Sequence, residues 1–382
     1  MRTIPFGRPI IGKEEKDVVV HVLSGPILTH GPRVKEFEVL FAQYIGAEYA
    51  IAVSSCTAAL QLAYFSLGVG PGHEVIVPAE THVATAHAVE LVGAKPVFVD
   101  AEKDTGNIDI DQIEAHLTEQ TKVIAVVHYL GMPANMHRIV DLARKHDIFV
   151  VEDCALAIGT YLDGVHAGLF GDVGCFSFYP VKHVTTAEGG MVLAKSKEIA
   201  ERISRQRAFG IDRNIVSERA IPGIYDVMEL GFNYRLNELG AALGIEQMRR
   251  IDGFLQKRQD NYTALTAGLM NIDEVELLQS SHDGYQSSYY CQTMILKKPL
   301  SEKRFEIVNY LKQHGVGTSV YYPRPVPHFS YYKNKYGYSD TSFPVASRIS
   351  GNSISLPVGP HVNSEDIGYM VTTIKNAIME VK

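Results

Sequence analysis

Between about residues 45 and 195, short apolar runs rich in β-branched residues alternate with amphipathic stretches. Seven runs have the length and composition of strands: 50–54, 74–78, 95–100, 122–128, 148–153, 173–178 and 189–194. Stretches between them, such as 57–68 and 136–147, have helical periodicity. Near-continuous apolar strands separated by helices are typical of a mostly parallel sheet that is buried on both faces. The pattern therefore predicts an α/β fold with a seven-stranded sheet flanked by helices.

After residue 195 the pattern changes. A helical segment and a Gly- and Pro-bearing loop near 210–224 lead to a long predicted helix at 237–251. The remainder predicts helices near 254–270, 302–314 and 364–380, strands at 289–297 and 316–322, and a Tyr- and Pro-rich loop that runs to about 345. This mixture of helices and strands, without a regular alternation, favours a smaller α+β domain. We place a large domain, including the N-terminal segment, at 1–251 and a small C-terminal domain at 252–382.

Composition and charge exclude several classes of protein. The 382 residues carry a net charge of −7, so the chain has no broad basic face of the kind that binds nucleic acid. The four cysteines form no C-x-x-C pair, which favours a reducing compartment over a disulfide framework. No apolar run approaches the roughly 20 residues that cross a bilayer, and the first residues lack the apolar core of a signal peptide. We expect a cytoplasmic protein with no membrane contact.

Parallel sheets bind ligands at the carboxyl ends of their strands. Four segments occupy such ends: Ser54–Ala58, Pro78–His82, Asp153–Leu156 and Ser177–Lys182. The first contains small and hydroxyl residues where a strand meets a helix, a place where backbone N–H groups can hold a phosphate. An ordinary helix cap explains the same residues, because Ser and Thr are common there.

Two charged features mark the other strand ends. Glu152 and Asp153 end an apolar strand, where a carboxylate is costly to bury unless it meets a positive group such as a protonated pyridine nitrogen. Pairing with an arginine or exposure to solvent remains an alternative. Lys182 lies in a turn between two apolar strands, where partial burial would favour the neutral amine that forms a Schiff base. An isolated loop lysine is otherwise most often a surface residue.

Other common sites are not indicated. No G-x-G-x-x-G follows the first strand, and there is no G-x-S-x-G element, so dinucleotide binding and serine hydrolysis are disfavoured. His82, His87, His128, His166 and His183 show no metal-ligand spacing, so we expect no metal centre.

Several motifs in order resemble those of one family. They are SSCTAALQLAY, VIVPAETHVATAHAV, VVHYLGMP, VVEDCALAIGT, GDVGCFSFYPVKHVTTAEGGMV and YDVMELGFNYRLNELGAALG. Together they resemble the DegT/DnrJ/StrS family of sugar aminotransferases, which have the type I fold of pyridoxal-phosphate (PLP) enzymes. The likeness extends from GRPIIGKEE to ISLPVGP, nearly the whole chain. The resemblance implies a large PLP-binding domain and a role in making amino sugars, for example for O-antigen or other polysaccharides.

The resemblance implies a role for each cofactor-site residue. Lys182 matches the lysine that joins the cofactor and moves the proton during transfer. Asp153 matches the aspartate that pairs with the pyridinium nitrogen. Ser177 and the backbone amides of Thr57 and Ala58 match the group that holds the phosphate.

Three further positions bear on the cofactor pocket. Asn233 matches an asparagine that reaches the phosphate from the neighbouring subunit, which implies a homodimer with shared active sites. His82 stands where the family usually has an aromatic residue stacked on the cofactor ring. Leu156 departs further, because relatives often carry Gln or His there to bond the cofactor's 3-hydroxyl. Some relatives replace the lysine with histidine and dehydrate their substrate, whereas here Lys182 is present and the histidine is residue 183.

The resemblance implies amino transfer from L-glutamate to the ketone, at C4, of a nucleotide-linked keto-deoxy sugar, by a ping-pong reaction through pyridoxamine phosphate (PMP). Arg324, in the loop 321–338, would face the diphosphate, and His328 matches a recurring family histidine. That loop could equally be a surface or a dimer contact. A PLP- or PMP-dependent sugar dehydratase and a non-catalytic regulatory member of the family remain the alternatives.

Overall fold

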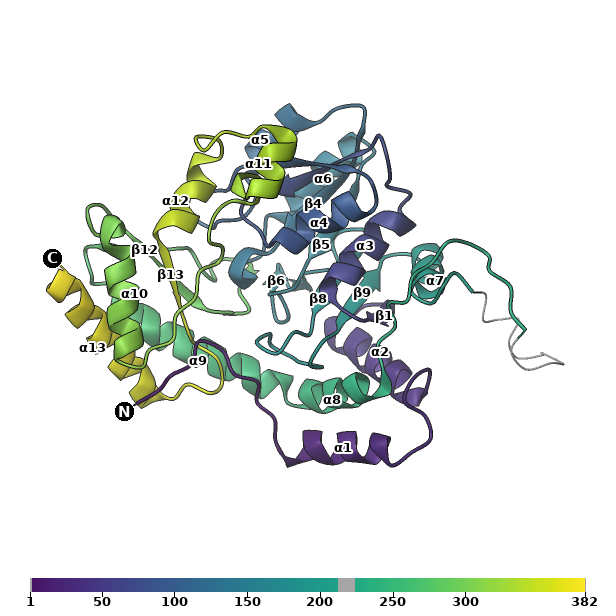
Figure 1. The fold of residues 1–382 in the computed structure, drawn as a ribbon, viewed down its shortest axis with the longest axis horizontal. Coiled ribbons are helices and arrows are strands. Elements are labelled where there is room, and N and C mark those ends of the chain that lie inside the picture. Colours follow the sequence, from purple (N-terminus) through teal and green to yellow (C-terminus); the bar gives the residue numbers. More distant parts are fainter. Residues whose placement is uncertain (1, 212–223, 382) are drawn as a thin grey trace.

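The computed structural model describes residues 2–211 and 224–381 (Figure 1). The predicted seven-stranded sheet is confirmed, with the order β1-β9-β8-β5-β4-β2-β3. Every strand runs parallel to the others except β9, which is antiparallel to both its neighbours. The strands are β1 (Tyr49–Val53), β2 (Glu74–Pro78), β3 (Lys95–Val99), β4 (Thr121–Val127), β5 (Phe149–Asp153), β8 (Val173–Ser177) and β9 (Gly190–Ala194).

Helices cover both faces of this sheet. On one face α3 (Cys56–Ser66), α4 (Val83–Leu91) and α7 (Lys197–Gln206) share a core with side chains such as Val75 and Val77. The intervening Ile76 joins α6 (Met136–Lys145) on the other face, where α2 (Pro32–Ile45) and α8 (Glu238–Arg249) also pack. Because neighbouring residues of a strand point to opposite faces, both-sided burial explains why these strands read as continuous apolar runs.

A second sheet forms with a core of its own. Strands β10 (Val275–Leu277), β12 (Gln292–Leu296) and β13 (Ser353–Leu356) pair in antiparallel order β10-β12-β13. The helices α9 (Ile251–Leu269), α10 (Arg304–Gln313) and α13 (Ser364–Val381) supply the rest of that core. Because α9 begins where the large-sheet helices end, we keep 251/252 as our proposed domain boundary. Helices α11 (Ser330–Tyr336) and α12 (Pro344–Asn352) nevertheless return to the core of the large sheet (Figure 1).

The predicted strand at 316–322 is wrong. Val316 forms a single bridge to Ile4, and Ser319 forms one to Ser355, so the segment touches two different partners and builds no ladder. Gly317 is also pressed against the backbone of residues 4–6, because a Cβ there would lie 2.5 Å from the amide nitrogen of Phe6.

Several elements lay outside the sequence prediction. They include α1 (Lys13–Leu23), α2, α5 (Ile110–Ile113), α11 and α12, the strands β10 and β13, and the short sheet of β11 (Tyr285–Gln286), β6 (Tyr161–Leu162) and β7 (Val165–His166). The Tyr- and Pro-rich stretch predicted as a loop therefore contains α11 and part of α12. Most of the loop expected near 210–224 lies outside the described residues. Within residues 2–211 and 224–381, no helix has the length and apolar character needed to span a membrane.

Candidate active site

A cavity of about 310 Å³ opens at the carboxyl edge of the large sheet. The structure brings all four predicted strand ends into its wall. The lining residues are Ser55, Cys56, Thr57, Leu60, His82, Ala84, Val127, His128, Asp153, Ala155, Leu156, Ser177, Tyr179, Val181, Lys182, Glu188, Tyr321 and Tyr322. Residues from β1 to the loop after α10 thus meet at one place, as the rule for parallel sheets predicts.

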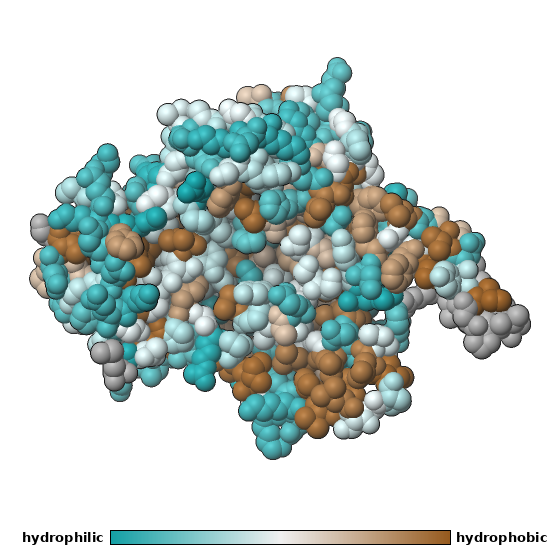
Figure 2. Space-filling model, in the orientation of Figure 1, coloured by the Kyte–Doolittle hydropathy of each residue, from teal (hydrophilic) through white to brown (hydrophobic). Residues whose placement is uncertain are grey.

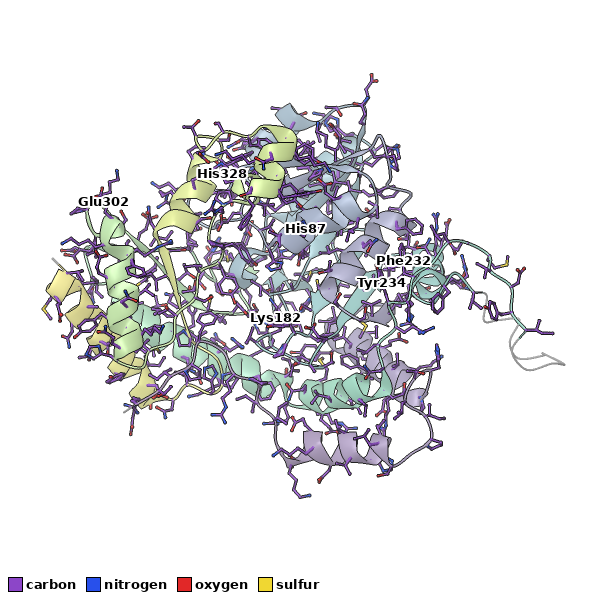
Figure 3. The ribbon with its side chains drawn as sticks, in the orientation of Figure 1. His87, Lys182, Phe232, Tyr234, Glu302 and His328 are labelled. Carbon is purple, nitrogen blue, oxygen red and sulfur yellow. The ribbon has the colours of Figure 1, made fainter. Side chains whose placement is uncertain are left out.

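Lys182 lines this cavity from the connection between β8 and β9, and Figure 3 marks its place near the middle of the molecule. Because β9 is antiparallel to β8, the chain turns back at the same edge of the sheet, and the lysine stays at the strand ends. Burial holds the pKa of its amine below the ordinary value, against the opposing effect of Cys56 and Asp153. The neutral amine is the nucleophilic form, so Lys182 is suited to attack a carbonyl.

His183 faces away from the cavity. Its Nε2 donates a hydrogen bond to the carbonyl of Ser288 at 3.1 Å, and the ring is buried. Burial lowers the pKa of this imidazole well below the usual range. Lys182, and not His183, is therefore the basic side chain of this turn that reaches the site.

The adjacent carboxylates of β5 point to opposite sides. Asp153 lines the cavity, and its oxygens accept hydrogen bonds from the hydroxyl of Thr85 at 2.8 Å and the amide of Ala155 at 3.1 Å. These neutral donors leave a carboxylate that can still pair with a cation in the cavity.

Glu152 has a structural environment instead. It accepts hydrogen bonds from the amides of Gly168, Phe170 and Gly171 at 2.6–2.9 Å and from Nε2 of His128 at 3.0 Å. His128 and Glu152 also lie near Cys154, in a buried group with metal-ligand atoms close together. Glu152 already accepts four hydrogen bonds, so its contact with His128 is explained by a hydrogen-bond network that holds the 168–171 turn in place, without a metal ion.

The first turn of α3 forms a cradle beside Lys182. The side chain of Ser55 caps the helix and accepts from the amide of Ala58 at 3.1 Å, so that amide is already engaged. The amides of Cys56 and Thr57 precede the first intrahelical bond, which runs from Ala59 to Ser55. These two amides, with the helix dipole and the nearby hydroxyl of Ser177, can hold a phosphate.

Gly190 lets β9 approach this cradle. A Cβ at this position would lie 2.6 Å from the carbonyl carbon and oxygen of Ser55 and 2.8 Å from the amide nitrogen of Cys56. These contacts are shorter than a real side chain allows, so any larger residue would displace the turn that carries the free amides.

The remaining wall is aromatic and apolar. Nδ1 of His82 accepts from the amide of Ala84 at 3.2 Å, and the ring lies edge-on to Tyr322 with 5.6 Å between centroids. Burial lowers the pKa of His82, which favours the neutral ring. Leu156 is 3% exposed and contributes only apolar surface to the wall. The sequence analysis did not identify Tyr322 or Thr85 as site residues. Thr85 follows His82 by three residues, about one helical turn, and this spacing is the sequence signal that places the two side chains near each other.

Ala58, whose amide is bonded to Ser55, does not line the cavity, and three further predicted site residues lie away from this wall. Arg324 is exposed and stacks over the ring of Phe329, 5.8 Å from its centroid. His328 is buried beside Phe343, and Figure 3 shows it above Lys182 in the view, among the C-terminal helices. Asn233 is exposed on the segment that precedes α8 and forms a single bridge to Ala208. This chain's own cavity is therefore built without these three residues.

The arrangement fits pyridoxal phosphate. A neutral lysine can join an aldehyde, a carboxylate can pair with a pyridinium nitrogen, and free amides at a helix start can bind a phosphate. These three groups come from one cavity of suitable size.

Comparison with known proteins decides the family. The DegT/DnrJ/EryC1/StrS aminotransferase family matches residues 9–375. The chain belongs to this family. The aminotransferase is 33% identical to GDP-perosamine synthase of Escherichia coli O157:H7 over 98% of both chains. It is also 33% identical to the spore coat polysaccharide biosynthesis protein SpsC of Bacillus subtilis, over 98% of this chain and 97% of that protein.

Solved structures agree with the sequence matches. A protein of Streptococcus pneumoniae described as a sugar aminotransferase, solved in its PLP form, has a TM-score of 0.93 and 30% identity, with both chains covered completely. PseC of Helicobacter pylori, an aminotransferase of pseudoaminic acid biosynthesis, has a TM-score of 0.91 and 25% identity over 99% of this chain and all of that one. The chain is thus a PLP-dependent sugar aminotransferase of fold type I.

Proposed function

We propose that this aminotransferase moves the amino group of L-glutamate to the C4 ketone of a nucleotide-linked keto-deoxy sugar. The observation that carries the proposal is the amine of Lys182, whose pKa burial lowers, in one cavity with the carboxylate of Asp153. The match to GDP-perosamine synthase supports a nucleotide-linked acceptor, since that relative's product is a nucleotide-linked amino sugar.

Each residue has a defined part in this proposal. The cofactor supplies an electron sink for the carbon that loses its proton. Lys182 would hold the cofactor and would move that proton as a general base and acid. Asp153 keeps the ring nitrogen protonated, and Thr85 fixes the orientation of its carboxylate. The amides of Cys56 and Thr57 and the hydroxyl of Ser177 hold the phosphate, with Ala58 contributing to the helix start.

His82 would lie against the cofactor ring, with Tyr322 edge-on to it. Leu156 offers no hydrogen bond to the ring's 3-hydroxyl. On the acceptor side, we retain Arg324 as a contact for the diphosphate and His328 as a second substrate-site residue of the loop 321–338.

The two half-reactions test this function separately. L-Glutamate alone should bleach the visible absorbance of the PLP-loaded protein, and a 4-keto sugar nucleotide should then restore it, because the amino group is stored on the enzyme between the two steps. A panel of 3-keto and 4-keto sugar nucleotides, with amine formation measured by mass spectrometry, identifies the acceptor. Failure of every amino donor to bleach the band would contradict the proposal, and loss of water from the sugar without amine formation would favour a dehydratase.

We also propose that the protein acts as a homodimer with shared sites. Figure 2 shows hydrophobic side chains gathered over and around α1, where Val20 is 61% and Leu23 57% exposed. Leu230, just after the segment outside the described residues, is 71% exposed. Asn233 follows Leu230 by three residues and does not line the active-site cavity of its own subunit. A partner that covers these apolar surfaces would place Asn233 at the other subunit's phosphate.

Complementation between inactive variants tests the shared site. Lys182→Ala should be inactive alone and Asn233→Ala nearly so. After joint refolding about one quarter of wild-type activity should return, because about half of the dimers are mixed and each mixed dimer contains one intact site of two. Sedimentation measurements on the same samples give the oligomeric state. Sites formed within one subunit would leave the mixture no more active than the sum of its components.

A further inference from the structure

Glu80 is a carboxyl group buried behind the aromatic wall of the active-site cavity. It lies in the connection between β2 and α4 and is 1% exposed. In the described part of the chain, the groups that act on this carboxyl are Ser350, the amide of Tyr322, Tyr129 and Asp100, and none of them is a cation. A buried carboxylate is costly without a positive partner, so the form in which Glu80 is present needs a physical explanation.

Each oxygen of this carboxyl contacts a different segment of the chain. Oε1 accepts a hydrogen bond from the backbone amide of Tyr322 at 3.0 Å, and Oε2 lies 2.6 Å from the hydroxyl of Ser350 on α12. Figure 1 shows that α12 continues directly into β13 of the second sheet. Glu80 thus connects the end of β2 in the large sheet with the loop after α10 and with the helix that leads to the smaller sheet.

Tyr129 holds the same segment a second time. Its hydroxyl donates to the carbonyl of Tyr321 and lies 3.3 Å from Oε1 of Glu80. The carbonyl of Tyr321 and the amide of Tyr322 belong to one peptide group, so both polar atoms of that peptide are engaged. The ring of Tyr322 lies edge-on to His82 with 5.6 Å between centroids, and both residues line the cavity. The contacts of Glu80 and Tyr129 therefore fix the backbone of the aromatic wall.

The donors around Glu80 favour its neutral acid form. A phenol has one hydrogen, and the shorter contact of the Tyr129 hydroxyl is the one to the carbonyl of Tyr321, so the carboxyl has only one amide and one hydroxyl as full donors. Asp100 differs, because it accepts from three backbone amides, two of them at the start of α12, at 2.8–3.0 Å. Burial and the charge of Asp100 raise the pKa of Glu80 to about 8. Of these two acids, Glu80 carries the proton.

We propose that Glu80 is a positioning residue that, as a neutral acid, seats the Tyr321–Tyr322 segment against His82 and makes closure of the cavity wall depend on a proton. A proton on Oε2 can be donated to Ser350, while Oε1 still accepts from the amide of Tyr322. Ionisation leaves an uncompensated charge in a buried place, which favours movement of the segment and entry of water. This role goes beyond the proposed function, on which it rests only for the substrates of the assay.

Glu80→Gln tests this role, because glutamine copies the neutral acid. Its Oε1 can accept from the amide of Tyr322, and its Nε2 can donate to Ser350. In the PLP-loaded wild-type protein, kcat/KM for L-glutamate should fall about 10-fold between pH 7 and pH 9, and KM should carry most of the change because the wall binds and does not react. The glutamine variant should lack this fall. An equal alkaline fall in both proteins would overturn the proposal.

Thermal unfolding of the PLP-loaded proteins follows the same proton without any substrate. The carboxyl keeps its proton up to about pH 8 in the folded protein, but only to about its ordinary value of 4.5 in the unfolded chain. The folded state binds the extra proton between these values, so wild-type stability falls as the pH rises through this window. From pH 5 to pH 8, the melting temperature of Glu80→Gln should rise relative to that of wild type by about 3 °C or more. A constant difference would contradict the proposal, whatever donor or acceptor the enzyme uses.

Two further variants separate the proton from the hydrogen-bond contact. Tyr129→Phe removes the bond to the carbonyl of Tyr321 but leaves Glu80 able to ionise, so KM should rise about 3- to 10-fold while the alkaline fall persists. Glu119→Gln neutralises an exposed acid and should match wild type in both measurements. Failure of Glu80→Gln to fold would also count against the role, since an amide of the same shape must fit where a neutral acid fits.

Discussion

Replacing Lys182 by alanine is expected to lower turnover by at least about 10⁴-fold and to abolish the visible absorbance band of the cofactor-loaded protein. The amine of Lys182 is the basic group of the β8–β9 turn that reaches the cavity, and burial lowers its pKa in the direction of the nucleophilic form. Its neighbour cannot replace it, because the imidazole of His183 is bonded to Ser288 on the far side of the backbone.

The matched control for this variant is Lys122→Ala. Lys122 is exposed on β4, and its loss should leave both the absorbance band and turnover unchanged. Thermal unfolding separates a chemical defect from a folding defect, since Lys182→Ala should melt near the wild-type temperature. Full turnover in Lys182→Ala would show that another residue performs the transfer.

Exchanging Asp153 for asparagine is expected to reduce kcat by about 10²- to 10³-fold with little change in stability. Asparagine can still accept from the amide of Ala155 at Oδ1 and can donate from Nδ2 to the hydroxyl of Thr85, so both contacts survive with one of them reversed. It carries no charge, however, to keep the pyridine nitrogen protonated. Single-turnover absorbance with L-glutamate measures the effect directly.

The adjacent Glu152→Gln variant provides the contrast. Three amides and His128 donate to Glu152, so its amide replacement should lower the free energy of unfolding by about 2–4 kcal/mol. Activity per folded molecule should remain near the wild-type value. If the two variants behaved alike, the assignment of one carboxylate to chemistry and the other to structure would be wrong.

The sequence predicted the large sheet well because its strands are buried on both faces. Such strands appear as unbroken apolar runs, and β2 begins and ends where its run, 74–78, was placed. The segment 316–322 has the same β-branched composition but lies between two unrelated partners, Ile4 and Ser355, and forms only single bridges. Composition reports the local preference of a strand, whereas the availability of a neighbour is a property of the whole fold.

Part of the candidate site was predictable because it lies at the ends of strands that the apolar pattern had identified. The rule for strand ends located Lys182 and Asp153, since both follow strands that the pattern identified. Tyr322 comes from an irregular loop far along the chain, and no periodic signal places such a loop over the cavity.

The position of β1 in the sheet has a consequence for synthesis of the protein. β1 is an edge strand of the described sheet and pairs there with β9. During synthesis β1 is made first, and it can enter the sheet only after β9, about 140 residues later in the sequence, has been made. The cavity wall likewise extends from Ser55 to Tyr322. A nascent chain that has emerged only to residue 250 already contains the lysine and the carboxylate but lacks Tyr321 and Tyr322 of the cavity wall. Capture of the cofactor therefore belongs to the nearly completed chain, after release of α9 and the loop that follows α10 from the ribosome.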